Sequence, residues 1–328
     1  MWLYLLIFHY SAEVKVFFKR LNLFFFVILF ILGGFNYSFA TDFSLSFDGT
    51  NDYVEVPFDA SMNPTEDYTV NSWAKVSNLP NDWQSVVTSR SNNGAGTVGG
   101  YMLYIEPSSR GSDWNYWTGT GNGWVKAVST VDPDLDTWQM MTTTFNNENK
   151  TMKLYVDGVL LTTKTNSGGL PMQTDKPLRM AAGVTENNTP QYYLNGKIDE
   201  VAVWSAELSA DEISQLYNSG ETLYAADNYG EYNSSSSLTA YWTMDNNTET
   251  SNGSGTTLFG EKNNNDGTLT NGPTWSTDVP GTLPTLLSSN PADNETDVAF
   301  DANITLTFSE IVKVGTGNIV LHNERVDC

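Results

Sequence analysis

Apolar and polar positions alternate along much of the chain, from Asp42 to about Tyr217. Segments such as FSLSF, DYVEV, YTVNSWAKV, QSVVTSR, YMLYIE and MKLYV are short and are separated by turn residues. Alternation with a period of two predicts strands that bury one face, and many short strands are typical of a sandwich. We therefore expect an all-β fold in which two antiparallel sheets form a jelly-roll sandwich.

Two local elements have clear sequence signals. In KLYVDGVLL, Asp157 and Gly158 supply the positive φ angles of a type I′ turn, which predicts a hairpin between the flanking strands. Near the end of the alternating region, Ser209 is followed three residues later by Glu212. This capping box predicts one short C-terminal helix that stops at Gly220.

Asp199 and Glu200 are adjacent carboxylates within the strand-like segment NGKIDEVAVW. By strict alternation, Asp199 shares a face with Val201 and Val203, and Glu200 points to the opposite face. An unpaired ionised carboxylate held away from water costs several kcal/mol, so Asp199 needs either backbone N–H donors or a cation. Glu200 is expected to be a surface carboxylate.

The first 40 residues have the pattern of an export signal. Lys19 and Arg20 precede an apolar run that ends in SFA at residues 38–40. We expect residues 1–40 to be removed, so that the protein is secreted or lies at the cell surface and inserts into no membrane after cleavage. The long apolar stretch before Lys19 leaves an uncleaved anchor as the alternative.

The rest of the chain divides into three segments by composition. Residues 41–222 hold the alternating pattern and the helix. Residues 223–283 begin as a polar linker and continue as a unit too short to bury a core alone. Residues 284–328 alternate again, but about 45 residues cannot close a β-sandwich of about 100. We infer a fragment of a larger modular protein.

Composition excludes several functions. The chain has 38 Asp and Glu against 16 Lys and Arg, a formal charge of −22, which disfavours nucleic acid and anionic membranes as partners. Its one cysteine, Cys328, can form no internal disulfide. His9 and His322 are the two histidines, so residues 41–321 can hold neither a histidine-dependent nucleophile nor an ordinary zinc site.

Aromatic residues in polar surroundings are the candidate binding residues. They occur in LPNDWQ and GSDWNYWTGTGNGW, and they are Trp83, Trp114, Tyr116, Trp117 and Trp124. Indoles on rigid loops can stack on sugar rings, but they can also pack over the rim of a sandwich. Arg90, at the end of QSVVTSR, can form a local salt bridge or contact an anionic ligand.

The segments SFDGTNDYVEVP, YTVNSWAKV, TWQMMTTTFNNENKTMKLYVDGVLL and LNGKIDEVAVWSAELSADEISQLYNSG resemble, in this order, the laminin G-like or concanavalin A-like lectin/glucanase jelly-roll domain of secreted bacterial proteins. AYWTMD with NNNDGTLTNGPTW resembles the opening of a second copy, and residues 284–323 resemble the first half of a bacterial Ig-like module. The resemblance implies a structural calcium ion with Asp199 as a side-chain ligand and Asp48 as a second one. Oxygen ligands suit calcium. For Asp48 the alternative is the former of an Asp-Gly turn.

The resemblance also bears on catalysis. Glucanases of this superfamily carry E-x-D-x-x-E or a close variant along one strand, and no such run occurs here. Asp52 and Glu55 fall on opposite faces of their predicted strand, as Asp199 and Glu200 do, so neither pair can flank a glycosidic bond. We therefore expect no enzyme activity from this domain.

The function expected from the sequence is a secreted, non-catalytic binding module that recognises a glycan or glycoprotein. It would belong to an adhesin-like protein with further β modules in the same parent chain. One alternative is the targeting module of a secreted polysaccharide-degrading enzyme whose catalytic domain lies elsewhere. A structural spacer is another.

Overall fold

The computed structural model describes residues 42–92, 97–165, 175–185, 187–245, 255–281, 286–290 and 305–308. The predicted export signal lies outside these residues. The described residues from Asp42 to Gly281 belong to one compact unit, and the two short stretches after it belong to another.

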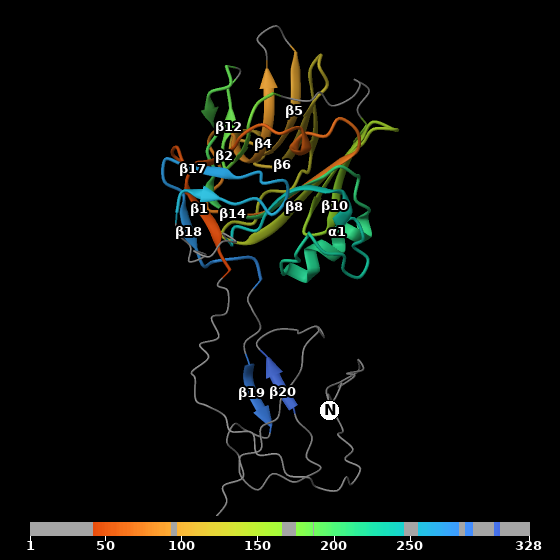
Figure 1. Cartoon of the computed structure of the whole chain (residues 1–328). Coiled ribbons are helices and arrows are strands. Elements are labelled where there is room, and N and C mark those ends of the chain that lie inside the picture. Colours follow the sequence, from red (N-terminus) through yellow and green to blue (C-terminus); the bar gives the residue numbers. More distant parts are fainter. Residues whose placement is uncertain are drawn as a thin grey trace, which may run out of the picture. The chain divides into compact units, whose positions relative to one another are not determined.

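Two antiparallel sheets form the main unit (Figure 1). Among the described residues the first sheet has eight strands, in the order β10 (Val159–Thr165), β9 (Thr151–Val156), β8 (Trp138–Asn146), β3 (Tyr68–Val76), β14 (Asn195–Trp204), β1 (Ser44–Asp48) and β18 (Thr274–Ser276), with β15 (Leu238–Trp242) also paired to β14. The second has eight as well, in the order β16 (Thr257–Leu258), β17 (Gly267–Thr270), β2 (Tyr53–Val56), β11 (Leu178–Met180), β4 (Gln84–Asn92), β5 (Val98–Ile105), β6 (Trp114–Gly119) and β7 (Trp124–Val128). A short separate pair consists of β12 (Gly183–Val184) and β13 (Pro190–Gln191). The prediction of an all-β, two-sheet jelly roll is confirmed.

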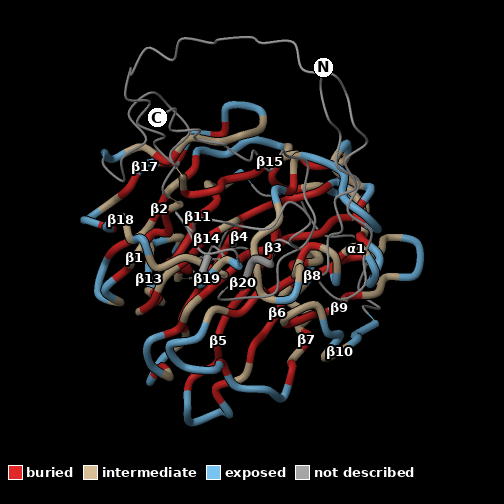
Figure 2. Tube along the Cα trace, turned by 90° about the horizontal axis from the view of Figure 1, so that it is seen from below, coloured by how far each residue is buried: buried red, intermediate tan, exposed pale blue. Residues whose placement is uncertain are grey.

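One hydrophobic core fills the space between the sheets. Leu45 and Phe145 reach it from the first sheet, and Leu103 and Tyr116 from the second. Since successive side chains of a strand point to opposite faces, about every second residue of the central strands lies in this core. Figure 2 shows the buried positions following the strands and the exposed ones gathered in the connecting turns.

A second cluster covers the outer face of the first sheet. Trp73 and Trp204 point away from the inter-sheet core, and helix α1 (Ala210–Tyr217) packs over them through Ile213 and Leu216. Burying each of these large side chains stabilises the fold by about 1.5 to 3 kcal/mol. The outer face of this sheet is therefore closed by the chain itself.

The local elements follow the sequence signals closely. Val156 pairs with Val159 across the predicted hairpin, and Asp157 and Gly158 have φ angles of 52° and 76°. The side chain of Ser209 accepts the Glu212 N–H, and the Glu212 side chain accepts the Ser209 N–H, as a capping box requires. The helix ends three residues before Gly220, because Asn218 already takes the left-handed C-cap conformation.

The prediction that residues 223–283 are a linker and the start of a second repeat is corrected by the structure. Strands of this segment complete both sheets of the main unit: β15 pairs with β14, β17 with β2 and β18 with β1. A polar segment that cannot bury a core of its own can still pair with open strand edges, which leaves fewer unpaired backbone groups. The sandwich therefore extends to residue 281.

Asp278 fastens the end of this segment to the first sheet. Its carboxylate accepts hydrogen bonds from Lys75 at 2.9 Å, from Trp138 Nε1 at 2.9 Å and from Lys197. Partial burial opposes ionisation, but these three donors outweigh it and lower the pKa of Asp278 to about 2. At neutral pH the Asp278 carboxylate is therefore fully ionised in this contact.

In the second unit, β19 (Leu286–Asn290) and β20 (Thr305–Phe308) form an antiparallel pair. This pair lies within the segment 284–328, for which the sequence predicts an Ig-like module. Across the described part of the chain, α1 and the 3-10 turns are too short or too polar to span a bilayer.

Candidate functional site

A β-bulge shapes the first candidate site. On β14, Asp199 pairs with Trp73, and the next paired residue is Ala202, opposite Asn71. Between these two pairs β14 advances by three residues and β3 by two, so β14 carries one extra residue, which is a β-bulge. Glu200 has a φ of 50°, in the left-handed region that non-glycine residues seldom adopt.

The bulge overturns the strict alternation predicted for this strand. Ile198 and Val201, three residues apart, both reach the inter-sheet core, and Asp199 points to the outer face. Glu200 is therefore not a surface carboxylate on the face opposite Asp199, because the extra residue turns both side chains into one cavity.

The bulge also marks the point where β14 changes its neighbour. β1 pairs with β14 as far as Ile198, and β15 pairs with the same edge from Val201 onward. The start of β1 and the end of β15 consequently meet beside the bulge. The backbone N–H of Phe43 donates to Asp245 Oδ1 at 2.9 Å and joins the two ends.

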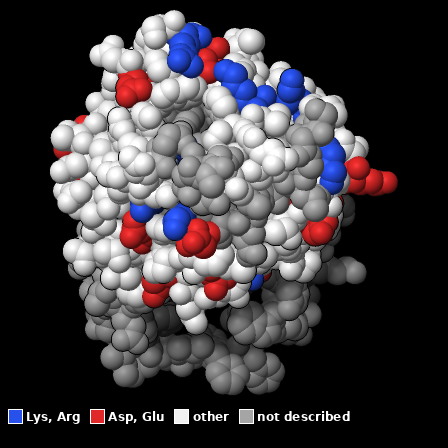
Figure 3. Space-filling view, turned by 90° about the horizontal axis from the view of Figure 1, so that it is seen from above, with Lys and Arg blue, Asp and Glu red and all other residues white. Residues whose placement is uncertain are grey.

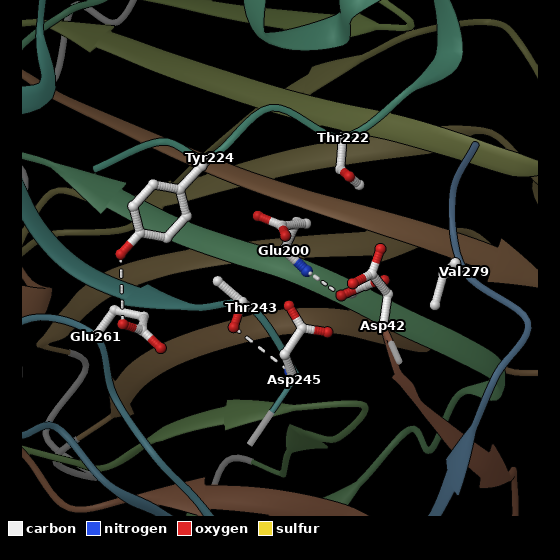
Figure 4. A pocket seen from close by; sticks show the side chains of 9 residues that line it. Asp42, Glu200, Thr222, Tyr224, Thr243, Asp245, Glu261 and Val279 are labelled. Carbon is white, nitrogen blue, oxygen red and sulfur yellow. Dashed lines mark hydrogen bonds between the residues drawn. The ribbon is translucent and has the colours of Figure 1, made fainter. Parts of the chain in front are cut away.

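The space at this junction is a cavity of about 370 Å³, here called the acidic cavity. Its lining residues are Asp42, Asp199, Glu200, Thr222, Tyr224, Thr243, Asp245, Glu261 and Val279. Figure 4 shows carboxylates from separate chain segments turned toward one space, with no basic side chain among the residues drawn. The cavity is thus rich in acceptors.

Burial and mutual repulsion keep protons on these carboxyl groups. Burial, and then the charge of Glu200, raise the pKa of Asp199 well above its usual range. Burial also raises the pKa of Glu200, although a hydrogen bond donated by Tyr241 opposes the shift. The pKa of Asp245 rises to about 6, mainly through burial. The cavity can therefore hold protons near neutral pH, or attract a cation in their place.

The two aspartates predicted to bind calcium lie apart. Asp48 pairs with Asn195, four positions before Asp199 on β14, so the two aspartates lie about 13 Å apart along the strand. Asp48 instead accepts the Thr50 N–H at 2.7 Å within its turn. Among the described residues, no three Asp, Glu, His or Cys side chains are spaced to hold a metal ion. Asp48 and Asp199 therefore do not share one ion, and the cation role of Asp199 stays a prediction.

A second cavity lies on the outer face of the second sheet. It measures about 160 Å³ and is called here the aromatic pocket. Its lining residues are Trp83, Arg90, Met102, Tyr104, Trp117, Trp124 and Tyr192. Four of the six binding residues predicted from the sequence, Trp83, Arg90, Trp117 and Trp124, meet in this pocket.

Neighbouring strands position these side chains. Trp117 on β6 lies opposite Met102 on β5, and Trp124 on β7 lies opposite Gly119. Residues directly opposite each other in an antiparallel pair share a face, so these side chains form the floor. Trp83 precedes β4 and Tyr192 follows β13, so both add walls from outside the sheet.

Ring and cation contacts hold the indoles in place. Trp83 makes an edge contact with Trp117, with ring centroids 5.8 Å apart. The guanidinium of Arg90 lies 5.0 Å from the Trp124 ring, and Lys126 Nζ lies 5.3 Å from the Trp117 ring. Such contacts contribute about 0.5 to 1 kcal/mol each at exposed sites. The pocket is therefore organised before any ligand arrives.

Two predicted ligand residues lie elsewhere. Trp114 and Tyr116 belong to β6 and are fully buried in the inter-sheet core, where the Tyr116 hydroxyl donates to Tyr68 at 2.6 Å. The placement of these two on a loop is wrong, because alternation along β6 turns them inward and Trp117 outward. A ligand on the surface cannot contact them.

Sequence reasoning missed several residues of both cavities. Alternation in YMLYIE places Met102 and Tyr104 on one face, but only strand pairing sets that face beside Trp117. Asp42, Asp245 and Glu261 carry no local signal, since they reach Asp199 through contacts across the whole main unit.

Several solved structures are similar to this chain. A proposed carbohydrate binding protein from Bacteroides ovatus is 17% identical, with a TM-score of 0.54 over 74% of this chain and 62% of that one. The CBM40 of a Ruminococcus gnavus IT-sialidase, solved with α2,3 sialyllactose, is 16% identical over 53% of this chain and 97% of its own, with a TM-score of 0.42. Domain 4 of AbnA, a GH43 extracellular arabinanase from Geobacillus stearothermophilus solved with arabinotriose, is 15% identical over 53% and 76%, with a TM-score of 0.42.

The chain thus spans less than two thirds of the length of the Bacteroides protein. No curated protein sequence matches it. The model of a bacterial Ig-like domain matches residues 281–325, which confirms the module expected there. The model of the concanavalin A-like lectin/glucanases superfamily matches residues 48–214, about half of the chain, and the chain belongs to this superfamily.

Proposed function

We propose that this chain is a non-catalytic module that binds glycans through the aromatic pocket. The observation that carries the proposal is the convergence of three tryptophans and two tyrosines on one face of the second sheet. Binding pockets combine flat apolar surfaces with a few polar groups that fix orientation, and this pocket has both.

The physical basis is stacking of a sugar ring on an indole. The apolar C–H face of a pyranose can lie on an aromatic ring, while the hydroxyl groups at its edge need hydrogen-bond partners. Arg90 and Tyr192 are polar residues of the lining beside Trp117 and Trp124. The carbohydrate binding proposed for the Bacteroides ovatus protein of the same fold agrees with this proposal.

A glycan array probed with the whole chain tests the proposal. We expect binding to a restricted set of glycans and at least a tenfold loss of affinity for Trp124→Ala. The matched control is Tyr229→Ala, which removes an exposed aromatic residue remote in sequence from every lining residue of the pocket. A folded wild-type protein that retains no glycan, or a Trp124→Ala variant that binds as the wild type does, would overturn the proposal.

The proposed setting is an exported protein at the cell surface or outside the cell. The Ig-like match after the sandwich supports a modular parent chain, either an adhesin or an enzyme that uses this module for targeting. Sequencing the full polypeptide recovered from the producing cells separates the two. A glycoside hydrolase domain would favour the targeting role, and repeated β modules alone would favour adhesion.

The acidic cavity favours a second candidate, carboxylate catalysis. General acids in glycosidases need a raised pKa, and Asp199, Glu200 and Asp245 have one. Asp199 and Glu200 are adjacent in one bulge, however, so they cannot stand on two sides of a glycosidic bond. Release of reducing ends from a polysaccharide panel, abolished by Asp245→Asn, would support catalysis over plain binding.

A further inference from the structure

The polar ends of two residues of the aromatic pocket point to strand β12. The hydroxyl of Tyr104 lies against Gly183, since a Cβ at this glycine would be 2.3 Å from the hydroxyl oxygen. Arg90 Nη1 donates to the carbonyl of Val184 at 2.9 Å. The Tyr104 hydroxyl and Arg90 Nε are both buried. These polar groups are directed into the protein, so a ligand meets mainly the ring of Tyr104.

Much of the remaining lining consists of aromatic rings and a thioether. Trp83, Trp117 and Trp124 contribute indoles, and Met102 contributes its sulfur and methyl group. The N–H of Trp117 is buried. No described lining residue is Asp, Glu, Asn or Gln. Acceptors for a hydroxyl group of a ligand are therefore scarce in this pocket.

The cations near the pocket contact the protein's own groups. Lys126 Nζ lies 5.3 Å from the Trp117 ring and donates to Glu106 at 2.8 Å, and Arg110 lies 5.7 Å from the Trp83 ring. Neither cation is among the lining residues. Much of the face drawn in Figure 3 is uncharged as well, although the chain has a formal charge of −22. Charge is therefore not the feature that selects a ligand here.

The size of the pocket limits what it can enclose. Its 160 Å³ is about five times the share of liquid volume of a water molecule. It is also well below the roughly 300 to 1,000 Å³ of pockets that enclose drug-sized ligands. The pocket has room for one substituent of a sugar and part of its ring, and the rest of a glycan stays outside.

A pocket of this kind distinguishes a methyl group from a hydroxyl group. A hydroxyl that enters it leaves its water partners and finds few replacements, which costs free energy. A methyl group gains free energy when it leaves water for an apolar surface. One such carbon in an apolar pocket changes binding by roughly 10- to 200-fold.

From these observations we propose that the aromatic pocket binds a methyl group carried by a neutral sugar, with the methyl group among the indoles and Met102. This inference rests on the proposed glycan-binding function. The methyl group can be C6 of a 6-deoxyhexose or the acetyl methyl of an N-acetylhexosamine, since both present the same apolar group beside a pyranose ring.

Calorimetric titration of the whole chain with matched sugars tests the inference. The pairs are galactose with 6-deoxygalactose, glucose with 6-deoxyglucose, and glucose with N-acetylglucosamine. We expect the methyl-bearing sugar of at least one pair to bind about tenfold or more tightly than its partner. The deoxy and acetamido pairs tell which source of the methyl group is preferred.

Two further readouts identify apolar burial as the cause. The heat-capacity change on binding should be negative, because apolar surface leaves water. The affinity should change less than about twofold between roughly 50 and 300 mM NaCl, because salt screens charged contacts and none carries this binding. A severalfold loss of affinity in the higher salt would overturn the inference in favour of recognition by charge.

Variants place the effect in the pocket. Met102→Gln introduces an amide that both donates and accepts, and it should weaken the methyl-bearing sugar at least tenfold and narrow its advantage over the hydroxylated partner. Trp124→Gln, at a half-buried position, should narrow the same advantage severalfold even if Met102→Gln fails to fold. Leu160→Gln makes a matched apolar-to-amide change at an exposed position of β10 and should change nothing.

Two failures have different meanings. Equal affinity within every pair, with binding lost in Trp117→Ala, would overturn the methyl specificity and leave glycan binding intact, as would a glycan array on which the retained glycans carry neither a deoxyhexose nor an N-acetyl group. A folded chain that binds none of these sugars and no glycan on the array would overturn the proposed function itself.

Discussion

The two cavities of the sandwich are opposite in origin and in chemistry. The aromatic pocket is built from residues 83–192, chiefly from adjacent strands of the second sheet, and its lining includes a cation and no carboxylate among the described residues. The acidic cavity joins residues 42, 199, 200, 245 and 261, and five of its nine lining residues are carboxylic acids. One cavity is made mainly by local strand pairing, and the other by closure of the whole unit.

The difference teaches what each cavity can do. A pocket on one sheet keeps its shape if the far end of the chain moves, which suits it to binding. The acidic cavity brings like charges from the two ends of the unit together, which opposes closure unless protons or a cation neutralise them. Its chemistry is therefore coupled to folding, and that of the aromatic pocket is not.

Removal of residues 223–281 should have the largest effect. The deletion takes away Asp245 and Glu261 of the acidic cavity and leaves every lining residue of the aromatic pocket in the chain. It also removes the buried Trp242 and Tyr241 and uncovers the edges of β2 and β14. Seven large apolar side chains of the described part of this segment are buried, namely Tyr232, Leu238, Tyr241, Trp242, Met244, Leu258 and Leu269. At about 1.5 to 3 kcal/mol each, their loss costs on the order of 10 to 20 kcal/mol, which is as large as a typical stability of about 5 to 15 kcal/mol.

We expect the truncated chain to lose its near-UV circular dichroism and its cooperative melting. A truncated chain that melts cooperatively and still binds glycan would instead restore the domain boundary at residue 222 that the sequence suggests.

Two tryptophans on β6 allow the next test. Trp114→Ala should destabilise the fold by about 3 to 5 kcal/mol, because it opens a cavity in the inter-sheet core. Trp117→Ala, three residues along on the outer face, should leave the melting temperature within a few degrees and lower glycan affinity at least tenfold. Thermal melts and binding isotherms measure both. Equal effects of the two variants on both readouts would remove the distinction between core and pocket.

The acidic cavity should make the protein more stable at pH 5 than at pH 8. The pKa of Asp245 is about 6 in the folded chain against about 3.9 in the unfolded one, so the folded state binds more protons in between. The stabilisation is complete below pH 4 and is lost as the pH rises through 6. Its size is about 1 to 2 kcal/mol after allowance for partial exposure. Asp278, whose pKa is lowered to about 2, acts in the opposite sense and only below pH 4.

Melting curves from pH 3 to 9 in the presence of a chelator measure this dependence. Asp245→Asn is the matched variant, because it keeps the shape of the side chain and removes the carboxyl group whose pKa is about 6. It should flatten the profile and stabilise the protein at pH 8. Without the chelator, millimolar calcium should raise the free energy of unfolding by about 1.4 kcal/mol at ten times the Kd if Asp199 binds a cation. The melting temperature should then rise in the wild type and not in Asp199→Asn. A flat wild-type profile would contradict the role of the carboxylates.

The smallest effect is expected at the helix that covers the first sheet. Ser209→Ala removes the side-chain cap of α1 and should cost about 1 kcal/mol. That corresponds to about 2 to 4 °C in melting temperature for a domain of this size. Glycan affinity and the pH profile should not change, so this variant calibrates the others. A change in either would show that the helix acts on the cavities.

Predictions from the sequence were correct where the interactions join residues close together in the chain. The hairpin at Asp157 and Gly158 and the cap at Ser209 depend on residues a few positions apart, and both were predicted correctly. Of the six candidate binding residues, four meet in one pocket, whereas Trp114 and Tyr116 were misplaced by the polar residues around them. Polar neighbours suggest a loop, but alternation within β6 decides which side chain is buried.

By itself, the sequence determined the all-β class, the alternating strands, the turn and the capped helix, because periodicity, turn conformation and capping are local properties of the chain. The tertiary structure decided the rest. A bulge lies at Asp199, where the strand paired with this edge of β14 changes from β1 to β15. Strands of residues 223–281 pair with both sheets. Such pairings depend on which strand edges remain open once the others have met, and no local pattern of residues records that.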